Sequence, residues 1–297
     1  MDIKVNITVE LVENLIKEQF PQWSHLSVTL VAVNGWDNST FRLGNEMSVR
    51  LPSAQRYAAK VALEQKWLPI LASHISVLIP APLVLGQPSQ EYPWQWSVYR
   101  WVDGESLNTI EHKNLDMCQL AQDLAKFLCE LQAIDTTGGP VPGAHNFYRG
   151  DDLSVYEHET IEAISQLKDY IDIEAARSVW KQATNSTWQN VPVWLHGDMA
   201  AGNILIQNGK LAAVIDFGGM AVGDPACDLV LAWTLFTGPS RKIFKSHIRV
   251  DKDTWVRARG WALWKALITL AALPDKTDVK AQEQLRIIHE IFKDETV

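Results

Sequence analysis

The stretch 195–219, LHGDMAAGNILIQNGKLAAVIDFGG, sets polar side chains of catalytic type beside short apolar runs. Those side chains are His196, Asp198, Asn203 and Asp216. The apolar runs at 204–206 and 213–215 are typical of buried strands, and polar groups beside such strands cost stability unless they are satisfied. Ionisable groups in such a place therefore indicate a functional site.

The spacing of these residues is that of a phosphoryl-transfer site. Asp198 precedes Asn203 by five residues, and Asp216 opens an Asp-Phe-Gly triplet, which is the arrangement that kinases use. The chemistry requires one carboxylate that faces the acceptor hydroxyl, and oxygen ligands for Mg²⁺ beside the phosphates. The segment NILIQNGKLAAVID is typical of a hairpin with its turn at 208–209, which would bring Asn203 and Asp216 together. A single Asp of this kind is usually a cap or turn residue, so the prediction rests on the whole set.

Other reaction classes lack their motifs in this chain. The sequence contains no G-x-x-x-x-G-K-[ST] phosphate loop, no G-x-S-x-G nucleophile turn and no H-E-x-x-H zinc pair. The formal net charge of −8 argues against a nucleic-acid partner, whose phosphates require a basic face. This charge is compatible with a cationic ligand.

Cysteine usage and apolar stretches bear on the compartment. Cys118, Cys129 and Cys227 show no C-x-x-C spacing, which favours free thiols in a reducing compartment. The N-terminal residues lack the apolar core of a signal peptide. The longest apolar stretch, 260–273, is too short to cross a membrane and contains Lys265. We therefore expect a cytoplasmic protein with no membrane partner, present as a monomer or homodimer.

The order of the predicted elements changes near residue 104. Before it, the patterns predict a helix at 8–19, five short strands and a second helix that opens at Ser53. After it, apart from the stretch 195–219, the patterns predict helices at 116–134, 158–170, 173–184, 224–236, 253–273 and 278–293. We expect an α+β fold of two lobes. Residues 1–102 would form a nucleotide-binding lobe with a five-stranded antiparallel sheet plus a helix, and residues 103–297 a mainly helical catalytic and acceptor-binding lobe.

The segments HGDMAAGNIL, IDFGG and GDPACDLVLAW together resemble the aminoglycoside phosphotransferase family, whose relatives include macrolide phosphotransferases and choline kinase. The resemblance extends over nearly the whole chain and implies a bilobal protein-kinase-like fold. It implies that Asp198 is the catalytic base, that Asn203 and Asp216 hold Mg²⁺, and that His196 supports the loop. Asp228 would be the acid that hydrogen-bonds the catalytic loop; a helix N-cap is the alternative role.

The resemblance also implies a cation on the third strand that holds the α- and β-phosphates and is fixed by a helical Glu. The position falls on Arg50 in EMSVRLP, where the family usually has Lys. Arginine can clamp phosphates through two parallel hydrogen bonds, so the role is preserved. Glu64 in ALEQKW is the expected acid, with a solvated surface residue as the alternative.

The loop that covers the phosphates is expected in NGWDNSTF. Gly35 would supply flexibility, and Ser39 and Thr40 could donate hydrogen bonds to phosphate. A plain hairpin turn explains Asp37 and Asn38 equally well.

The nucleotide base is expected at the connection VYRWVDG. The resemblance places adenine against the backbone of Arg100 and Val102, with Tyr99 at the back of the pocket. Because this tyrosine could narrow the purine site, both ATP and GTP stay open as donors.

The residues that bind the acceptor are harder to predict from the sequence. The segment GAHNFYRGDDL reads as a loop before a helix, and such loops carry specificity. Its candidate contacts are His145, Tyr148, Asp151 and Asp152. A solvated loop with an Asp helix cap explains the two acids equally well. Late tryptophans could border the acceptor cleft, although core packing is their usual role: Trp255, Trp261 and Trp264.

The sequence thus predicts an enzyme that moves the γ-phosphate of ATP or GTP, with Mg²⁺, to a hydroxyl of a small molecule. An aminoglycoside-like or other antibiotic is the leading acceptor, and a housekeeping kinase of a sugar, amino alcohol or other metabolite is the alternative. A nucleotide-binding pseudokinase is the alternative from another class. The intact set of Asp198, Asn203 and Asp216 argues against it.

Overall fold

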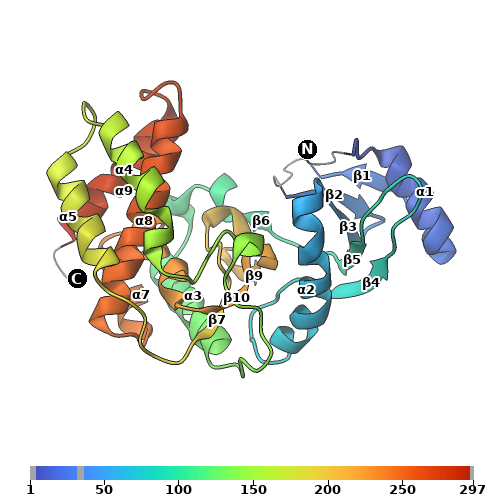
Figure 1. The fold of residues 1–297 in the computed structure, drawn as a ribbon. Coiled ribbons are helices and arrows are strands. Elements are labelled where there is room, and N and C mark those ends of the chain that lie inside the picture. Colours follow the sequence, from blue (N-terminus) through green and yellow to red (C-terminus); the bar gives the residue numbers. More distant parts are fainter. Residues whose placement is uncertain (1–4, 32–36, 295–297) are drawn as a thin grey trace.

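The computed structural model describes residues 5–31 and 37–294 and divides into two lobes (Figure 1). The sheet lobe, up to Arg100, holds a five-stranded sheet with helices α1 and α2, and the helical lobe, from Glu105 onward, holds the other helices. Arg100 ends strand β5, whereas Glu105 opens β6 and already pairs with β8 of the helical lobe. This is the mixed α+β fold that the sequence predicts.

The sheet of the first lobe is antiparallel, with strands in the order β1-β2-β3-β5-β4. Its strands are β1 Val28–Leu30, β2 Asn38–Leu43, β3 Met47–Pro52, β4 Pro82–Gly86 and β5 Trp96–Arg100. Gly44 turns β2 into β3 with a φ of 58°, a left-handed conformation that glycine adopts without strain. The register sets Arg50 between Thr40 and Ser97, so Arg50 lies on the central strand.

Helix α1 (Val9–Gln19) covers the core of this sheet. Thr8 caps it, because its side chain accepts a hydrogen bond from Leu11 N at 3.2 Å. The residue at 8 is therefore the cap of the predicted helix and not its first turn. One stripe of the helix is buried at helical spacing and packs on the strands: Leu11, Val12, Leu15 and Ile16.

Helix α2 (Gln55–Ala72) joins the core of the other lobe, and Figure 1 shows it between the sheet and the helices. Trp67, Leu68 and Leu71 are buried in the cluster that the helical lobe forms. The predicted start at Ser53 is wrong, because Ala54 has an extended backbone and serves as the N-cap residue. Ser53 N instead donates to Asp37 O at 2.8 Å, which ties the approach to α2 to the start of β2.

The helical lobe is built around α8, which packs against α4, α5 and α9. The elements of this lobe are β6 Glu105–Ser106, α3 Met117–Gln132, α4 Glu157–Gln166, α5 Ile173–Thr184, β7 Val193–Leu195, β8 Ile204–Gln207, β9 Lys210–Val214, β10 Ala221–Gly223, α6 Leu231–Thr234, α7 Gly238–His247, α8 Lys252–Ala272 and α9 Val279–Lys293. Within residues 5–31 and 37–294, no helix combines the length and apolar character that crossing a membrane requires.

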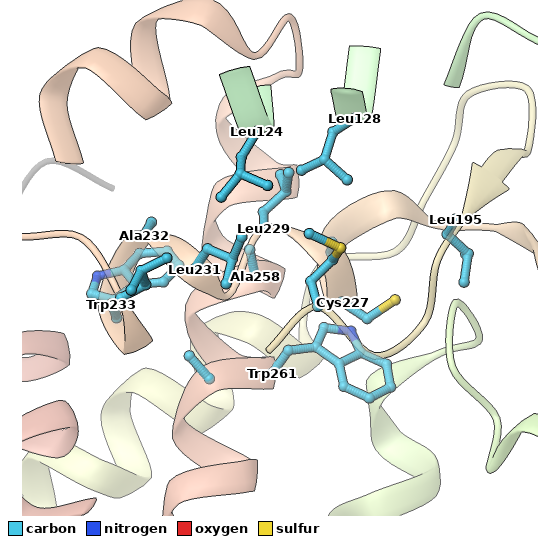
Figure 2. Packing of buried hydrophobic residues seen from close by; sticks show 14 of the residues in the cluster. Leu124, Leu128, Leu195, Cys227, Leu229, Leu231, Ala232, Trp233, Ala258 and Trp261 are labelled. Atoms are coloured by element: carbon cyan, nitrogen blue, oxygen red, sulfur yellow. The ribbon is translucent and has the colours of Figure 1, made fainter. Parts of the chain in front are cut away.

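The core of this lobe forms around the segment that follows β10. Figure 2 shows Leu229 beneath Leu124 and Leu128 of α3, with Ala258 and Trp261 of α8 on the other side. All of these side chains are nearly or completely buried. The segment that carries Asp228 is thus held between two long helices.

The helices of this lobe differ from the prediction in three places. The stretch 224–236 forms a 3₁₀ turn at Pro225–Asp228 and the short helix α6, because the chain bends where the Asp228 side chain turns toward the loop after β7. Helix α7 was not predicted, since its first residues read Gly-Pro-Ser, a turn signal. Thr237 and Ser240 form a capping box there, and proline fits the first turn, where no N–H is needed. Helix α4 also ends earlier than predicted, at Gln166.

Candidate active site

Strand β7 and the β8–β9 hairpin carry the polar residues of the central motif at their ends. Strand β7 ends directly before His196, and β8 begins directly after Asn203. The two residues of the hairpin turn, 208 and 209, have φ angles of 52° and 73°, as a tight hairpin requires. The N–H of Ile215 donates to Asn203 O at 2.8 Å, so Asp216 follows beside Asn203. The predicted hairpin is confirmed.

The carboxylate of Asp198 is oriented by its neighbours. The side-chain amide of Asn203 donates to Asp198 O at 2.9 Å and to Asp198 Oδ2 at 3.1 Å. The N–H of Asp198 donates to His196 Nδ1 at 3.2 Å, and His196 Nε2 lies 3.0 Å from Ile215 O. Because Nδ1 accepts from an amide and Nε2 faces a carbonyl, both nitrogens of this buried ring are used to hold the backbone of the two loops. His196 therefore supports the loop and leaves Asp198 as the base candidate.

The carboxylate of Asp228 binds the backbone at the start of the same loop. Asp228 is fully buried, and its two carboxylate oxygens accept hydrogen bonds from His196 N at 2.6 Å and Gly197 N at 2.8 Å. Burial raises the pKa of Asp228, while the two backbone N–H groups oppose that shift. The carboxylate thus satisfies two loop amides that would otherwise be buried without partners.

The loop also requires a glycine at position 197. Gly197 has a φ of 81°, and a Cβ there would lie 2.1 Å from Gly219 O. The loops that carry Asp198 and Asp216 therefore approach each other backbone to backbone, which only glycine permits.

An ion-pair network joins the two lobes. Arg50 Nη2 donates to Asp216 Oδ1 at 2.9 Å, and Arg50 Nη1 lies 3.6 Å from Glu64 Oε1. Glu64 is 4% exposed and also accepts a hydrogen bond from the Tyr99 hydroxyl, so it is not a solvated surface residue. Burial alone raises the pKa of Asp216, but the charge and hydrogen bond of Arg50, with the charge of Lys60, bring it below its usual value. The Arg50 pKa is correspondingly raised, because the two carboxylates outweigh its burial.

Asn203 and Asp216 suit Mg²⁺ as oxygen donors. The amide N–H groups of Asn203 point at Asp198, which leaves its carbonyl oxygen to a metal, and Asp216 Oδ2 is not used by Arg50. Asp216 has a left-handed φ of 66°, an unusual conformation for this residue and one that clusters at functional sites. The described part of the chain holds no cluster of three His, Cys, Asp or Glu side chains. Mg²⁺ sites beside nucleotides typically use only one or two carboxylates with phosphate oxygens and water.

The other predicted nucleotide contacts lie along the same sheet. Ser39 and Thr40 are on β2, and Thr40 is opposite Arg50, whereas the predicted Gly35 lies outside the described residues. Arg100 ends β5 and its N–H donates to Ala81 O, just before β4, at 2.9 Å, and Val102 follows in the connection between the lobes. Tyr99 is almost fully buried behind them. Burial and the charge of Glu64 raise the pKa of Tyr99, so its hydroxyl stays a proton donor.

One charged pair in this region was not predicted. Lys60 Nζ lies 2.5 Å from Asp37 Oδ2, and the Lys60 residue is only 6% exposed. Lys60 lies four residues before Glu64, so the two side chains share one face of α2. This spacing could have placed Lys60 at the site, although it says nothing of Asp37.

The predicted acceptor loop is tied to the loop of Asp216. Asn146, fully buried, donates to Gly219 O at 3.2 Å. The carboxylates of Asp151 and Asp152 accept from backbone N–H groups within their own loop, and Asp152 caps the following 3₁₀ turn. Tyr148 is exposed with a left-handed φ of 57°.

His145, in the predicted acceptor loop, lies within electrostatic reach of Lys60 on α2. Burial and the charge of Lys60 lower the pKa of His145. The three late tryptophans are buried, at 8% exposure or less: Trp255, Trp261 and Trp264. Trp264 Nε1 donates to Glu159 Oε1 at 2.6 Å, and its ring stacks with Tyr156.

Solved structures with the same fold are aminoglycoside and macrolide phosphotransferases. The GDP complex of wild-type aminoglycoside 2'-phosphotransferase-IIIa is 21% identical, with a TM-score of 0.70, and the match covers 96% of this chain and 99% of that one. The streptomycin–ATP ternary complex of APH(2")-IIa is 20% identical, with a TM-score of 0.58 and coverage of 97% and 96%. The macrolide 2'-phosphotransferase MphH from Brachybacterium faecium is 18% identical, with a TM-score of 0.60 and coverage of 94% and 97%. At these identities the likeness shows the fold.

Sequence comparison identifies one curated relative and one family. The protein YcbJ of Bacillus subtilis (strain 168) is 24% identical over 169 residues, which are 55% of this chain and 51% of YcbJ. The chain thus matches about half the length of that relative. The model of the phosphotransferase enzyme family APH matches residues 29–266, which include both ends of the ion-pair network and the whole hairpin motif. The chain belongs to the APH phosphotransferase enzyme family.

Proposed function

We propose that this protein is a Mg²⁺-dependent kinase that transfers the γ-phosphoryl group of ATP or GTP to a hydroxyl of a small molecule. The observation that carries the proposal is the hydrogen bond from Asn203 to Asp198, with Asp216 following beside Asn203 and bound by Arg50. Family membership supports the reaction class. The unpaired cysteines support action in the cytoplasm, and we propose a monomer or homodimer there.

Each residue has a distinct part in this proposal. Asp198 accepts the proton of the acceptor hydroxyl, and Asn203 keeps the carboxylate aimed by donating to Oδ2. Arg50 supplies a planar cation that binds phosphate oxygens through parallel hydrogen bonds. A bound Mg²⁺, held by Asn203 and Asp216, would neutralise charge on the β- and γ-phosphates.

Two classes of acceptor have support. Solved structures of similar fold are complexes with kanamycin, streptomycin and gentamicin, which favours an aminoglycoside or another antibiotic. The second candidate is a hydroxylated metabolite that carries no set of positive charges.

Two cations favour this second candidate. Arg149 lies 4.6 Å and Lys265 Nζ lies 5.8 Å from the Trp264 ring, and neither forms an ion pair with an acid of the described residues. Burial and the charge of Arg149 lower the pKa of Lys265, while Asp198 opposes the shift, so Lys265 stands within electrostatic reach of Asp198. A polycationic acceptor would be repelled by this pair.

The direct test is Asp198→Asn. The variant should bind Mg–ATP like the wild type and lose nearly all transfer, because the amide cannot accept the hydroxyl proton. A panel of aminoglycosides, macrolides and hydroxylated metabolites, read by nucleotide consumption with ATP and with GTP, would identify acceptor and donor. Thermal stabilisation by Mg–ATP without turnover of any panel member would favour the pseudokinase alternative. Full activity of the variant would rule out Asp198 as the base.

A further inference from the structure

Lys60 places a buried ammonium group beside the loop of Asp216. The residue lies one turn before Glu64 on α2 and is 6% exposed. Its Cδ lies 3.4 Å from the position that a Cβ on Gly218 would take, and its Nζ lies 5.0 Å from the centre of the Phe147 ring. Lys60 thus sits where α2, the loop of Asp216 and the acceptor loop meet.

Among the described residues, the ammonium group has one partner of opposite charge, Asp37. Nζ lies 2.5 Å from Asp37 Oδ2, and no other hydrogen bond of this group is found among residues 5–31 and 37–294. An ammonium has three donors, so two of them are available to further oxygen atoms. The Lys60 side chain is 7% exposed and that of Asp37 is 28% exposed. Asp37 can therefore turn to water, whereas Lys60 cannot.

The carboxylate of Asp37 lies where it would repel the phosphates of a bound nucleotide. Asp37 directly precedes β2, the strand that carries Ser39 and Thr40 opposite the region of Arg50. A triphosphate bound along this strand would bring several negative charges near the carboxylate, and like charges in a partly buried site repel strongly. Lys60 would gain most from leaving Asp37 for a phosphate oxygen, because a buried cation needs compensating anions.

Lys60 and Arg50 both lie near the metal-ligand candidate, Asp216. The Cδ of Lys60 lies against Gly218, two residues after Asp216, and Arg50 Nη2 lies 2.9 Å from Asp216 Oδ1. The two cations therefore flank one carboxylate from two elements, β3 and α2. Arg50 alone holds it by a hydrogen bond.

From this geometry we propose that Lys60 is a second phosphate-binding cation, and that Asp37 holds its ammonium until the terminal phosphate of a nucleotide takes the place of the carboxylate. The inference rests on the proposed function, because it adds a contact to the same nucleotide site. It assigns Asp37 the role of an internal competitor of phosphate.

Binding titrations of Mg–ATP, Mg–ADP and adenosine test the exchange. Lys60→Met should weaken Mg–ATP by about tenfold or more, Mg–ADP by less, and adenosine not at all, because only the terminal phosphate loses its cation. Asp37→Asn should tighten Mg–ATP by about threefold, since an anion that competes with phosphate is removed. Lys66→Met is the matched control: it is the same change on the exposed side of α2, where Lys66 stacks on Trp67, and it should bind like the wild type.

Lys60→Met weakens and Asp37→Asn tightens the binding of Mg–ATP only if phosphate replaces the Asp37 carboxylate at Lys60. If Asp37→Asn weakens Mg–ATP as much as Lys60→Met, and the double variant is no weaker than either, the pair is a fixed clasp and the inference is overturned. Equal binding by Lys60→Met and the wild type overturns it as well. If thermal unfolding shows that Lys60→Met does not fold, the change in Mg–ATP affinity of Asp37→Asn decides: tighter binding supports the inference, and weaker or equal binding overturns it. Failure of the proposed function would look different, because the wild type itself would bind no Mg–nucleotide.

Discussion

Gly197→Ala tests whether the close approach of two backbones holds the catalytic geometry. A Cβ at 197 would lie 2.1 Å from Gly219 O and 2.7 Å from Gly219 C, whereas real contacts of a Cβ essentially never fall below 3.0 Å. The loops of Asp198 and Asp216 would have to part by about 0.9 Å, the difference between these distances. Because the obstacle is backbone, no side chain can rotate away to relieve it.

The expected loss has two sources of similar size. The left-handed φ of 81° costs an alanine roughly 1–2 kcal/mol, and forced displacement of packed backbone adds about 1–3 kcal/mol. Gly209→Ala is the matched control, because Gly209 has a φ of 73° but nothing within 4 Å of the added Cβ. The control should lose only about 1–2 kcal/mol, the strain part.

Urea unfolding and turnover together separate the two effects. Gly197→Ala should also lower turnover by about 100-fold with the acceptor that the panel identifies, since a shift near 1 Å at the reacting groups has that consequence. Gly209→Ala, in the hairpin turn, should keep its turnover. Equal losses of stability in the two variants, or unchanged turnover in Gly197→Ala, would show that the close approach does not set the geometry.

Three further predictions concern the charged groups. Asp228→Asn should lower the free energy of unfolding by about 1–3 kcal/mol, because one loop amide loses its acceptor and faces an NH₂ group; an unchanged urea midpoint would contradict this. Arg50→Met should destabilise at pH 7 and much less at a pH below the folded pKa of Asp216, which lies under the usual Asp value of about 3.9, since a lowered carboxylate pKa stabilises above the unfolded value and that stability is lost as the pH falls through the folded value. Urea unfolding of both proteins at the two pH values checks it, and a gap independent of pH would refute the ion-pair argument. Asn203→Ala should raise the Mg²⁺ concentration needed for half-maximal turnover, and an unchanged Mg²⁺ titration would remove Asn203 from the metal site.

The catalytic hairpin could be predicted from the sequence because its determinants are local. Asn208-Gly209 specifies a two-residue turn, and the apolar runs on each side form the two strands, so Asn203 and Asp216 come near each other. A bulge between Leu205 and Ile206, which the sequence does not signal, shifts the pairing by one residue and sets Asn203 against Ile215. The family resemblance is confirmed by the family model, whose match over residues 29–266 includes these motifs. The roles assigned to the individual residues stay predictions until they are tested by substitution.

The contacts of α2 could not be predicted in this way. Lys60 and Asp37 are 23 residues apart within the sheet lobe, and Arg50 and Asp216 are 166 apart and belong to different lobes, so only tertiary packing brings each pair together. The misread segment 224–236 fails for a related reason. It is buried on nearly every side, and burial on all sides removes the periodicity from which a helix is recognised.

The ion pair between Arg50 and Asp216 links the state of the nucleotide site to the arrangement of the lobes. Arg50 belongs to the central strand of the sheet lobe, whereas Asp216 follows the hairpin of the helical lobe, and α2 supplies Glu64 while its apolar face lies in the helical core. Any motion that separates the lobes must break the 2.9 Å contact and leave Asp216 without its cation. Because 38% of the Asp216 side chain is exposed, water offsets part of that loss. A bound Mg–nucleotide would offset the rest, by giving Asp216 a metal and Arg50 a phosphate at once. On the proposed function, the pair would therefore favour the observed arrangement of the lobes when the site is free, and breaking it would cost least with a Mg–nucleotide bound.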